Sequence, residues 1–377
     1  MIGSRCRKKS WDFLTAPFGR RYFTGMTKAN HNHPMKSSFM ILGIAALPLA
    51  CVPLLQADSA RPVHTYSIVA YDKSTGELGV AVQSHWFSVG ALVPWAESGV
   101  GAVATQSFVE VSYGPLALDM MRAGKTPVEA LAGLLKADPN ESVRQVAVID
   151  GRGRATAHTG KNCIPEAGHY IGDGFACQAN LMLKNTVWTA MAQAYESTPG
   201  ELVDRMLAAL EAAEAEGGDI RGRQSAAILV VRGKSSGVWW KDRLYDLRVE
   251  DHPDPVAELK RLVRLDKAYR RMNNGDDFLT AGKVEAAMAE YAAAMAMVPD
   301  NAEMAFWTAT TLASLGKVEE SLPLFSKAFG LNPQWAVLLP RLPKVGQFPD
   351  DPPLIQRILK LAPKTKSPGL NPAQQAE

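Results

Sequence analysis

Strand-like and helix-like segments alternate in blocks between residues 65 and 249, and this order constrains the fold more than any other feature of the chain. Two helical segments separate one group of strands from the next. A single helix between strands would predict parallel crossovers and a nucleotide-binding sheet. Paired helices instead predict an α+β fold, an αββα four-layer sandwich of two antiparallel sheets covered by helices. The expected strands are 65–72, 78–85, 99–106, 144–150, 155–159, 175–180, 225–232 and 244–249, and the expected helices are 115–123, 127–136, 187–196 and 201–216.

A helical repeat with an offset of 34 residues follows this region. The tetrapeptide Gly-Lys-Val-Glu occurs at residues 282–285 and again at 316–319, and Pro299 recurs as Pro333. This period is typical of tetratricopeptide-like helix pairs. Two units bury little core of their own, so we expect them to stack on a preceding helix at residues 255–272.

The Pro-rich junction at residues 252–255 resembles a domain boundary. It predicts that a chain ending near Glu258 folds and stays soluble without the repeats. The alternative is that Leu259, Leu262 and Leu265, which lie at helical spacing, dock onto the sandwich. The expected organisation is a leader region at 1–64, a sandwich domain at 65–252, a helical repeat domain at 253–345 and a Pro-rich, partly disordered tail at 346–377.

Residues 35–60 have the pattern of an export signal peptide. Lys36 supplies a positive start, residues 39–55 are apolar, and small residues near Ala60 offer a cleavage site. We therefore expect translation to start at Met35 and the protein to be periplasmic or secreted. A retained membrane anchor is the alternative, but two prolines interrupt an apolar stretch shorter than the roughly 20 residues that a spanning helix needs.

The basic balance of the chain belongs to its first residues. Lys and Arg outnumber Asp and Glu by 41 to 38, but residues 1–64 hold nine of the basic and two of the acidic side chains, which leaves 32 against 36. The mature chain is thus mildly acidic. Its charge gives no argument for binding nucleic acid or an anionic surface.

Two cysteines, Cys163 and Cys177, remain beyond the leader. In an oxidising compartment they could form a disulfide, and the alternative is two buried thiols that pack as small apolar residues. The remaining histidines lack the close spacing of metal ligands, so we expect neither a metal site nor a cofactor.

Thr65 opens the first expected strand a few residues beyond the leader. A threonine at a chain N-terminus carries its own general base, the neutral α-amine, and so becomes a nucleophile. Ser67 lies on the same face of the strand and is the second candidate. Cleavage after Ala60 would leave four residues ahead of Thr65, so further trimming would be required. The alternative is that Thr65 is a β-branched residue that starts an edge strand.

Several segments resemble one family of bacterial and archaeal proteins, the domain-of-unknown-function family 1028. They include TYSIVAYD, GELGVAVQSHWFSVGA, RQVAVID, ACQAN and DHPDPVAEL, and the likeness covers about residues 65–259. The fold of that family is classed as similar to N-terminal nucleophile (Ntn) hydrolases, so the resemblance implies the same four-layer sandwich. Many members begin Met-Thr, and loss of the methionine would leave threonine first at the position of Thr65. The resemblance assigns no activity.

Polar residues at strand ends are candidates for holding a substrate. Asn180 could donate its amide to a tetrahedral oxyanion, and the alternative is a turn residue. A glycine-marked loop offers guanidinium groups that could grip a carboxylate, and the alternative is a loop paired with itself. The candidate substrate-binding residues are Gln83, Ser84, Thr105, Gln106, Asp219, Arg221, Arg223, Gln224 and Ser225.

The sequence thus predicts an exported Ntn-type amidohydrolase that cleaves a small amide or peptide-like bond through Thr65. The alternative is a non-catalytic sandwich that binds a ligand or an envelope component. In both interpretations the helical repeats could dock a partner protein, and self-association into a homo-oligomer is left open.

Overall fold

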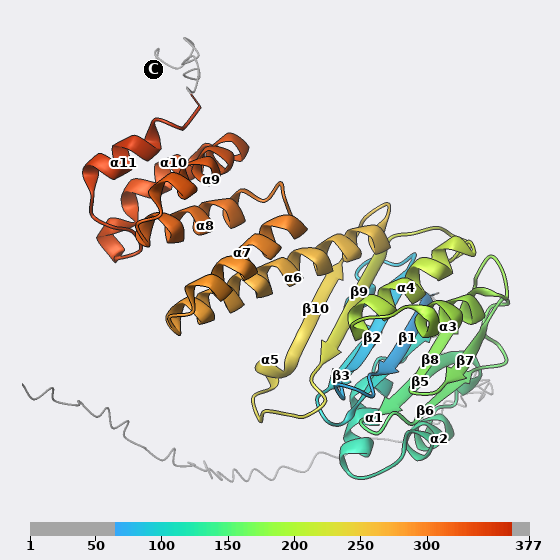
Figure 1. The fold of residues 1–377 in the computed structure, drawn as a ribbon. Coiled ribbons are helices and arrows are strands. Elements are labelled where there is room, and N and C mark those ends of the chain that lie inside the picture. The colour runs from blue at the N-terminus through green and yellow to red at the C-terminus, as the bar shows by residue number, and fades with distance from the viewer. Residues whose placement is uncertain (1–64, 364–377) are drawn as a thin grey trace, which may run out of the picture. The chain divides into compact units, whose positions relative to one another are not determined.

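A computed structural model describes residues 65–363, which form two antiparallel sheets, helices that cover them, and a C-terminal helical region (Figure 1). The predicted leader lies outside the described residues. The larger sheet has the strand order β10-β9-β2-β1-β8-β7. Its strands are β1 (Thr65–Tyr71), β2 (Leu78–Ser84), β7 (Gly168–Gly172), β8 (Phe175–Ala179), β9 (Ser225–Val231) and β10 (Arg243–Val249).

Strand β1 is an interior strand. It pairs antiparallel with β2 on one side and with β8 on the other, so the expectation that Thr65 begins an edge strand is wrong. The pairing with β8 joins segments about a hundred residues apart, for example Ile68 with Cys177. Local periodicity carries no information on such a long-range partner.

The smaller sheet contains four strands in the order β3-β4-β5-β6. Gly99, with φ +74°, forms a turn that delays the strand expected from residue 99 until Gly101. Strands β3 and β7 were not expected, because each has at most five residues and no apolar alternation. The strands are β3 (Pro94–Glu97), β4 (Gly101–Ser107), β5 (Arg144–Asp150) and β6 (Ala155–Thr159).

Alternating side chains divide the apolar core into layers. Val69 packs between the two sheets, whereas its neighbour Ile68 faces the helices on the outside of the larger sheet. Val103 of the smaller sheet packs against helices on the opposite outer face. The helices that cover the larger sheet are α3 (Val187–Ser197) and α4 (Leu202–Ala215), and those on the smaller sheet are α1 (Tyr113–Arg122) and α2 (Pro127–Ala137).

Helix α6 (Pro255–Thr280) belongs to two cores. Asp254 caps its start and Pro255 occupies the first turn. Leu259 and Val263 are buried in the core outside the larger sheet, whereas Ala268 and later residues pack within the helical region. The packing of Leu259 favours the alternative that this residue docks onto the sandwich, because a chain ending near Glu258 would lose part of the sandwich core; whether that chain folds stays a prediction.

The helical region continues as α7 (Val284–Met297), α8 (Ala302–Ser314), α9 (Val318–Leu331), α10 (Gln334–Leu338) and α11 (Pro352–Leu359). Tyr291 and Phe325, which are 34 positions apart, are both buried, and Gly282 and Gly316 both have positive φ in the turn between the two helices of a pair, α6 with α7 and α8 with α9. The two segments therefore play equivalent structural roles, and their assignment to tetratricopeptide-like repeats stays a prediction. The tail expected from residue 346 is partly helical, because Ile358 of α11 is buried in the core of this region.

Candidate functional site

A cluster of buried polar side chains surrounds the start of β1. Thr65 is fully buried, and its register partners place a row of hydroxyl groups across three strands: Thr65 lies beside Ser84 of β2, which lies beside Ser225 of β9. The Thr65 Oγ1 donates a hydrogen bond to Ser84 Oγ over 3.1 Å. Ser225 holds the segment after β2 in place, because its hydroxyl donates to the carbonyl of Trp86 and accepts from the backbone N–H of Val89.

Two amide side chains contact the Thr65 carbonyl, and a third amide, Gln145, joins them. Gln106 Nε2 donates to the Thr65 carbonyl oxygen over 3.0 Å, and Asn180 Nδ2 reaches the same oxygen over 3.4 Å. Both amides also donate to Oε1 of Gln145, over 2.7 and 2.8 Å. All three are fully buried between the sheets. Buried amides are tolerated only when they are hydrogen-bonded, so this network fixes the position of the Thr65 backbone.

Ser67 is held by the same network. Its hydroxyl donates to Gln106 Oε1 over 2.6 Å and accepts from Gln178 Nε2 over 3.2 Å. The hydroxyl proton is thus committed to an amide oxygen, which is a poor base. The Oε1 atom of Gln178 is buried and has no hydrogen-bond partner. We therefore assign Ser67 a structural part in the network.

Two non-glycine residues beside the site have left-handed backbone conformations. Ser107, which follows Gln106, has φ +71°, and Leu181, which follows Asn180, has φ +56°. A leucine in this region is uncommon, and such conformations cost about 1–3 kcal/mol each. Both amides that contact Thr65 are therefore aimed by strained strand ends.

The network extends toward a half-buried histidine. Gln145 Nε2 donates to Thr159 Oγ1 over 2.9 Å, and Thr159 Oγ1 lies 2.8 Å from Nδ1 of His169. Burial lowers the pKa of His169, with a smaller contribution from His158. The ring is therefore neutral near pH 7, so one ring nitrogen carries a proton and the other accepts.

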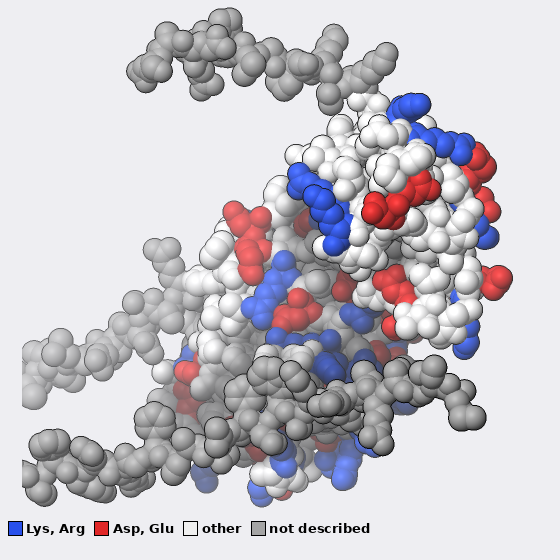
Figure 2. Space-filling model, turned by 90° about the vertical axis from the view of Figure 1, so that its left-hand side faces the viewer, with Lys and Arg blue, Asp and Glu red and all other residues white. Residues whose placement is uncertain are grey.

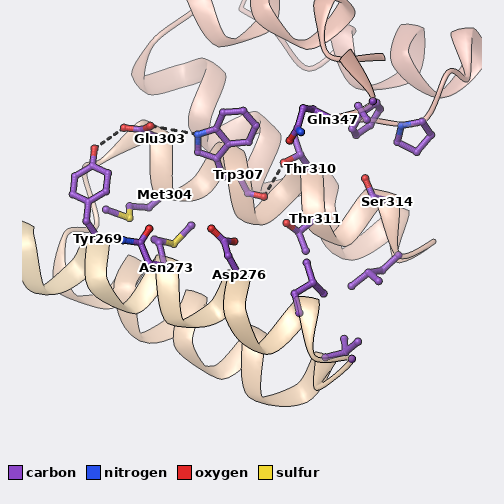
Figure 3. Close-up of a pocket in the computed structure, with 18 residues that line it drawn as sticks. Tyr269, Asn273, Asp276, Glu303, Met304, Trp307, Thr310, Thr311, Ser314 and Gln347 are labelled. Atoms are coloured by element: carbon purple, nitrogen blue, oxygen red, sulfur yellow. Dashed lines mark hydrogen bonds between the residues drawn. The ribbon is translucent and has the colours of Figure 1, made fainter. Parts of the chain in front are cut away.

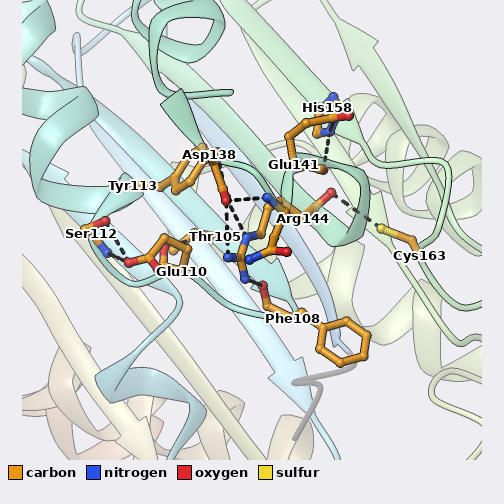
Figure 4. Close-up of polar contacts among 11 residues, drawn as sticks. Thr105, Phe108, Glu110, Ser112, Tyr113, Asp138, Glu141, Arg144, His158 and Cys163 are labelled. Carbon is orange, nitrogen blue, oxygen red and sulfur yellow. Dashed lines mark hydrogen bonds and ion pairs between the residues drawn. The ribbon is translucent and has the colours of Figure 1, made fainter. Parts of the chain in front are cut away.

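An ion pair beneath the smaller sheet fixes the segment that follows Gln106 (Figure 4). Arg144 Nε lies 2.7 Å from a carboxylate oxygen of Asp138, and both side chains are about one-tenth exposed. Arg144 also donates to the Phe108 carbonyl over 2.7 Å, and Tyr113 donates to Asp138 over 3.2 Å. The thiol of Cys163 donates to the Arg144 carbonyl over 3.4 Å. This arrangement ties the end of β4 to β5.

The charged residues of the predicted glycine-marked loop, residues 219–224, make contacts in two different places. Asp219 is fully buried and accepts from the backbone N–H of His85, the residue after Ser84, so it lies near the start of β1. It forms an ion pair with Arg221 over 2.6 Å, so the carboxylate offsets the positive charge of that guanidinium. Arg223 instead pairs with Glu214 and, over 3.5 Å, with Asp254.

Four of the predicted substrate-binding residues point away from Thr65. Gln83 lies opposite Tyr66 on the helix-covered face of the larger sheet, where neither atom of its amide has a partner. Thr105 faces the outside of the smaller sheet and donates to the Glu110 carbonyl over 3.0 Å. Gln224 bonds Asp251 in an exposed contact, and Arg223 makes the pairs described above. Gln83 and Thr105 face other layers because residues that alternate along a strand point to opposite faces of its sheet, whereas Arg223 and Gln224 belong to a loop that bonds elsewhere.

Sequence reasoning missed Gln145, Gln178, Thr159 and His169. A usable signal was present, since Gln145 and Gln178 are polar residues inside otherwise apolar strands, RQVAVID and FACQA. A buried amide at an inward position demands a partner on the facing sheet.

Cys163 and Cys177 are both free and buried, so the interpretation as two apolar thiols holds in the structure. Within residues 65–363, no group of three or more His, Cys, Asp or Glu side chains is arranged to hold a metal ion. None of the helices in that range is long and apolar enough to cross a membrane. On the face drawn in Figure 2, acidic and basic side chains are intermingled.

Residues 65–259 match the model of a family of unknown function, DUF1028. The chain belongs to this family. The matched range includes the whole cluster around Thr65 and ends at Leu259, inside α6. The DUF1028 chain is also similar to the crystal structure of protein SPO2555 from Silicibacter pomeroyi, which carries the same family model, with 30% identity over 53% of this chain and 88% of that chain and a TM-score of 0.48. The curated proteins contain no match.

Proposed function

We propose that the DUF1028 domain is an Ntn-type amidohydrolase that cleaves a small amide or peptide-like bond, with Thr65 as its nucleophile after removal of the preceding residues. One observation carries the proposal: the amides of Gln106 and Asn180 converge on the backbone of Thr65 at the buried start of an interior strand. The layered order of helices and sheets, which resembles that of Ntn hydrolases, supports it. The apolar stretch at residues 39–55 supports action outside the cytoplasm.

The chemistry follows from a free α-amine at Thr65. The amine takes the proton from Oγ1 as that oxygen attacks the carbonyl carbon of the substrate. Asn180 Nδ2, whose 3.4 Å bond to the Thr65 carbonyl is long, can redirect one N–H to the oxyanion while the other stays on Gln145. The C–N bond then breaks, the ammonium returns its proton to the leaving amine, and water hydrolyses the Thr65 ester.

A second function, binding without catalysis, is favoured by the closed surroundings of Thr65. Its side chain is fully buried, and it lines none of four pockets identified among the described residues. In this alternative the sandwich is a scaffold and Thr65 packs beside Ser84.

The mature N-terminus separates the two functions. Mass spectrometry of the protein recovered from the periplasm should find Thr65 first. A chain that begins Met-Thr65, from which methionine is removed, should be acylated by a β-lactone that reacts with N-terminal threonine. A chain with one residue retained ahead of Thr65 should not react.

The expected result for Thr65→Ala is loss of acylation with the fold retained, whereas Thr65→Ser should keep part of it. Ser67→Ala is the matched control, because it removes a hydroxyl of the same strand face that the proposal gives no chemical role. A native N-terminus upstream of Thr65, or acylation that survives in Thr65→Ala, would favour binding.

A further inference from the structure

The largest of the four pockets lies in the helical region and has no part in the proposed hydrolysis. It has a volume of about 1080 Å³ and lies between α6 and α8 (Figure 3). Its walls come from residues 269–279 of α6, Gly282 and Val284 at the turn into α7, residues 303–314 of α8 with the following Leu315, and a closing segment at residues 346–349. We call this feature the α6–α8 groove.

The charge of the groove has one sign. Of its 18 lining residues, Asp276 and Glu303 are charged, and both are acidic; Lys, Arg and His do not occur among them. The other lining residues are uncharged, and they include apolar side chains such as Trp307 and Leu279 as well as five polar ones, Asn273, Thr310, Thr311, Ser314 and Gln347. A groove whose lining combines apolar side chains with carboxylates and includes no basic group is complementary to a cation on an apolar stem.

The two carboxylates differ in how many hydrogen bonds they already accept. Glu303 joins the two walls, because it accepts from the Tyr269 hydroxyl on α6 and, over 3.3 Å, from the Trp307 indole on α8. Asp276 accepts from the Tyr291 hydroxyl through Oδ1 over 2.6 Å, and it points from α6 toward α8 in Figure 3. The remaining acceptor positions of Asp276 are available to a ligand, since a carboxylate accepts about four hydrogen bonds.

We propose that the α6–α8 groove binds an extended segment of a partner protein that carries a Lys or Arg side chain between apolar residues. The stem of that side chain lies against Trp307, and its charged end bonds Asp276. The groove selects for the charge, and its apolar wall holds the flanking residues.

The test uses the full chain and immobilised nine-residue peptides. The central residue is Lys, Arg, norleucine or Glu, and the flanking positions vary among Leu, Val, Pro and Ala. The native chain should bind peptides with a central Lys or Arg on the order of tenfold more tightly than the norleucine series, as expected for a charge-assisted hydrogen bond. Absence of any preference for a basic centre would overturn the proposal.

Asp276→Asn removes the charge while its side-chain oxygen can still accept from Tyr291, so the fold should persist. This variant should lose the preference for Lys and Arg and keep the binding of norleucine peptides. Asp277→Asn is the matched control, because Asp277 is an exposed acid next in sequence that does not line the groove. An equal effect of both substitutions would assign the preference to general surface charge.

The C-terminal segment of the chain itself, residues 364–377, carries Lys364 and Lys366 and could also occupy the groove. Deletion of this segment tests that alternative. Unchanged peptide binding after the deletion supports an external partner. Binding that strengthens after the deletion would show that the chain's own C-terminal segment fills the groove, which overturns the partner proposal.

Discussion

Leu259 should contribute strongly to the stability of the sandwich, although it lies beyond the Pro-rich junction. Its side chain is fully buried in the core outside the larger sheet, together with Val256 at 3% exposure and Val263 at 2%. Replacing a buried leucine by alanine costs about 2–5 kcal/mol. Since a domain has a total stability of about 5–15 kcal/mol, Leu259→Ala should remove a large part of it.

The assay is urea unfolding followed by circular dichroism, compared with Leu331→Ala. Leu331 is 44% exposed at the end of α9, so its replacement should change the free energy of unfolding by less than about 1 kcal/mol. A chain ending at Glu258 loses both Leu259 and Val263, roughly 3–6 kcal/mol of burial, and should aggregate. A chain ending at Arg264 retains both side chains and should be more soluble.

A change below about 0.5 kcal/mol in Leu259→Ala would refute this reasoning. A soluble chain ending at Glu258 with the stability of the longer chain would do so as well. Either result would show that α6 docks on the sandwich without stabilising it and that the junction at residues 252–255 is the true domain boundary.

Two further predictions concern buried groups of the sandwich. Arg144→Met should destabilise the protein by about 3–5 kcal/mol in urea unfolding, because it leaves the buried carboxylate of Asp138 without its partner. Burial alone would raise the pKa of Asp138, but hydrogen bonds from Arg144 and Asn140 outweigh burial, so the pKa is lowered. The stabilising contribution of this carboxylate is therefore complete above about pH 4 and is lost as the pH falls further. If the difference in stability between the native protein and Asp138→Asn stayed constant from pH 5 to pH 2, this reasoning would be contradicted. Burial raises the pKa of both the Cys163 and the Cys177 thiols, so iodoacetamide at pH 8 should label them only after denaturation, whereas a mass corresponding to a disulfide between them would show a different packing.

The sequence by itself determined the order of the longer strands and helices, although it did not predict the short strands β3 and β7. Apolar alternation in β1 separates Ile68 from Val69 in any register, and the repeated glycines at 282 and 316 mark turns whatever their surroundings. These features are local, because they follow from side-chain direction and backbone conformation within a few residues.

The candidate site was predicted in part. Ser84, Gln106 and Asn180 contact Thr65, and Asp219 bonds the backbone of His85, the residue after Ser84. Gln83, Thr105 and Arg223 lie elsewhere, because one step along a strand, or one turn of a loop, places a side chain in another layer.

Only the tertiary structure decided which segments meet. The pairing of β1 with β8 made Thr65 the start of an interior strand, and the stacking of the two sheets brought Gln145 against Asn180. The tertiary structure also decided that α6 contributes to two cores, since the sequence alone allowed Leu259 to pack against either the sandwich or the helical region. Contacts between residues distant in the chain depend on how whole faces fit together, and no local pattern of side chains carries that information.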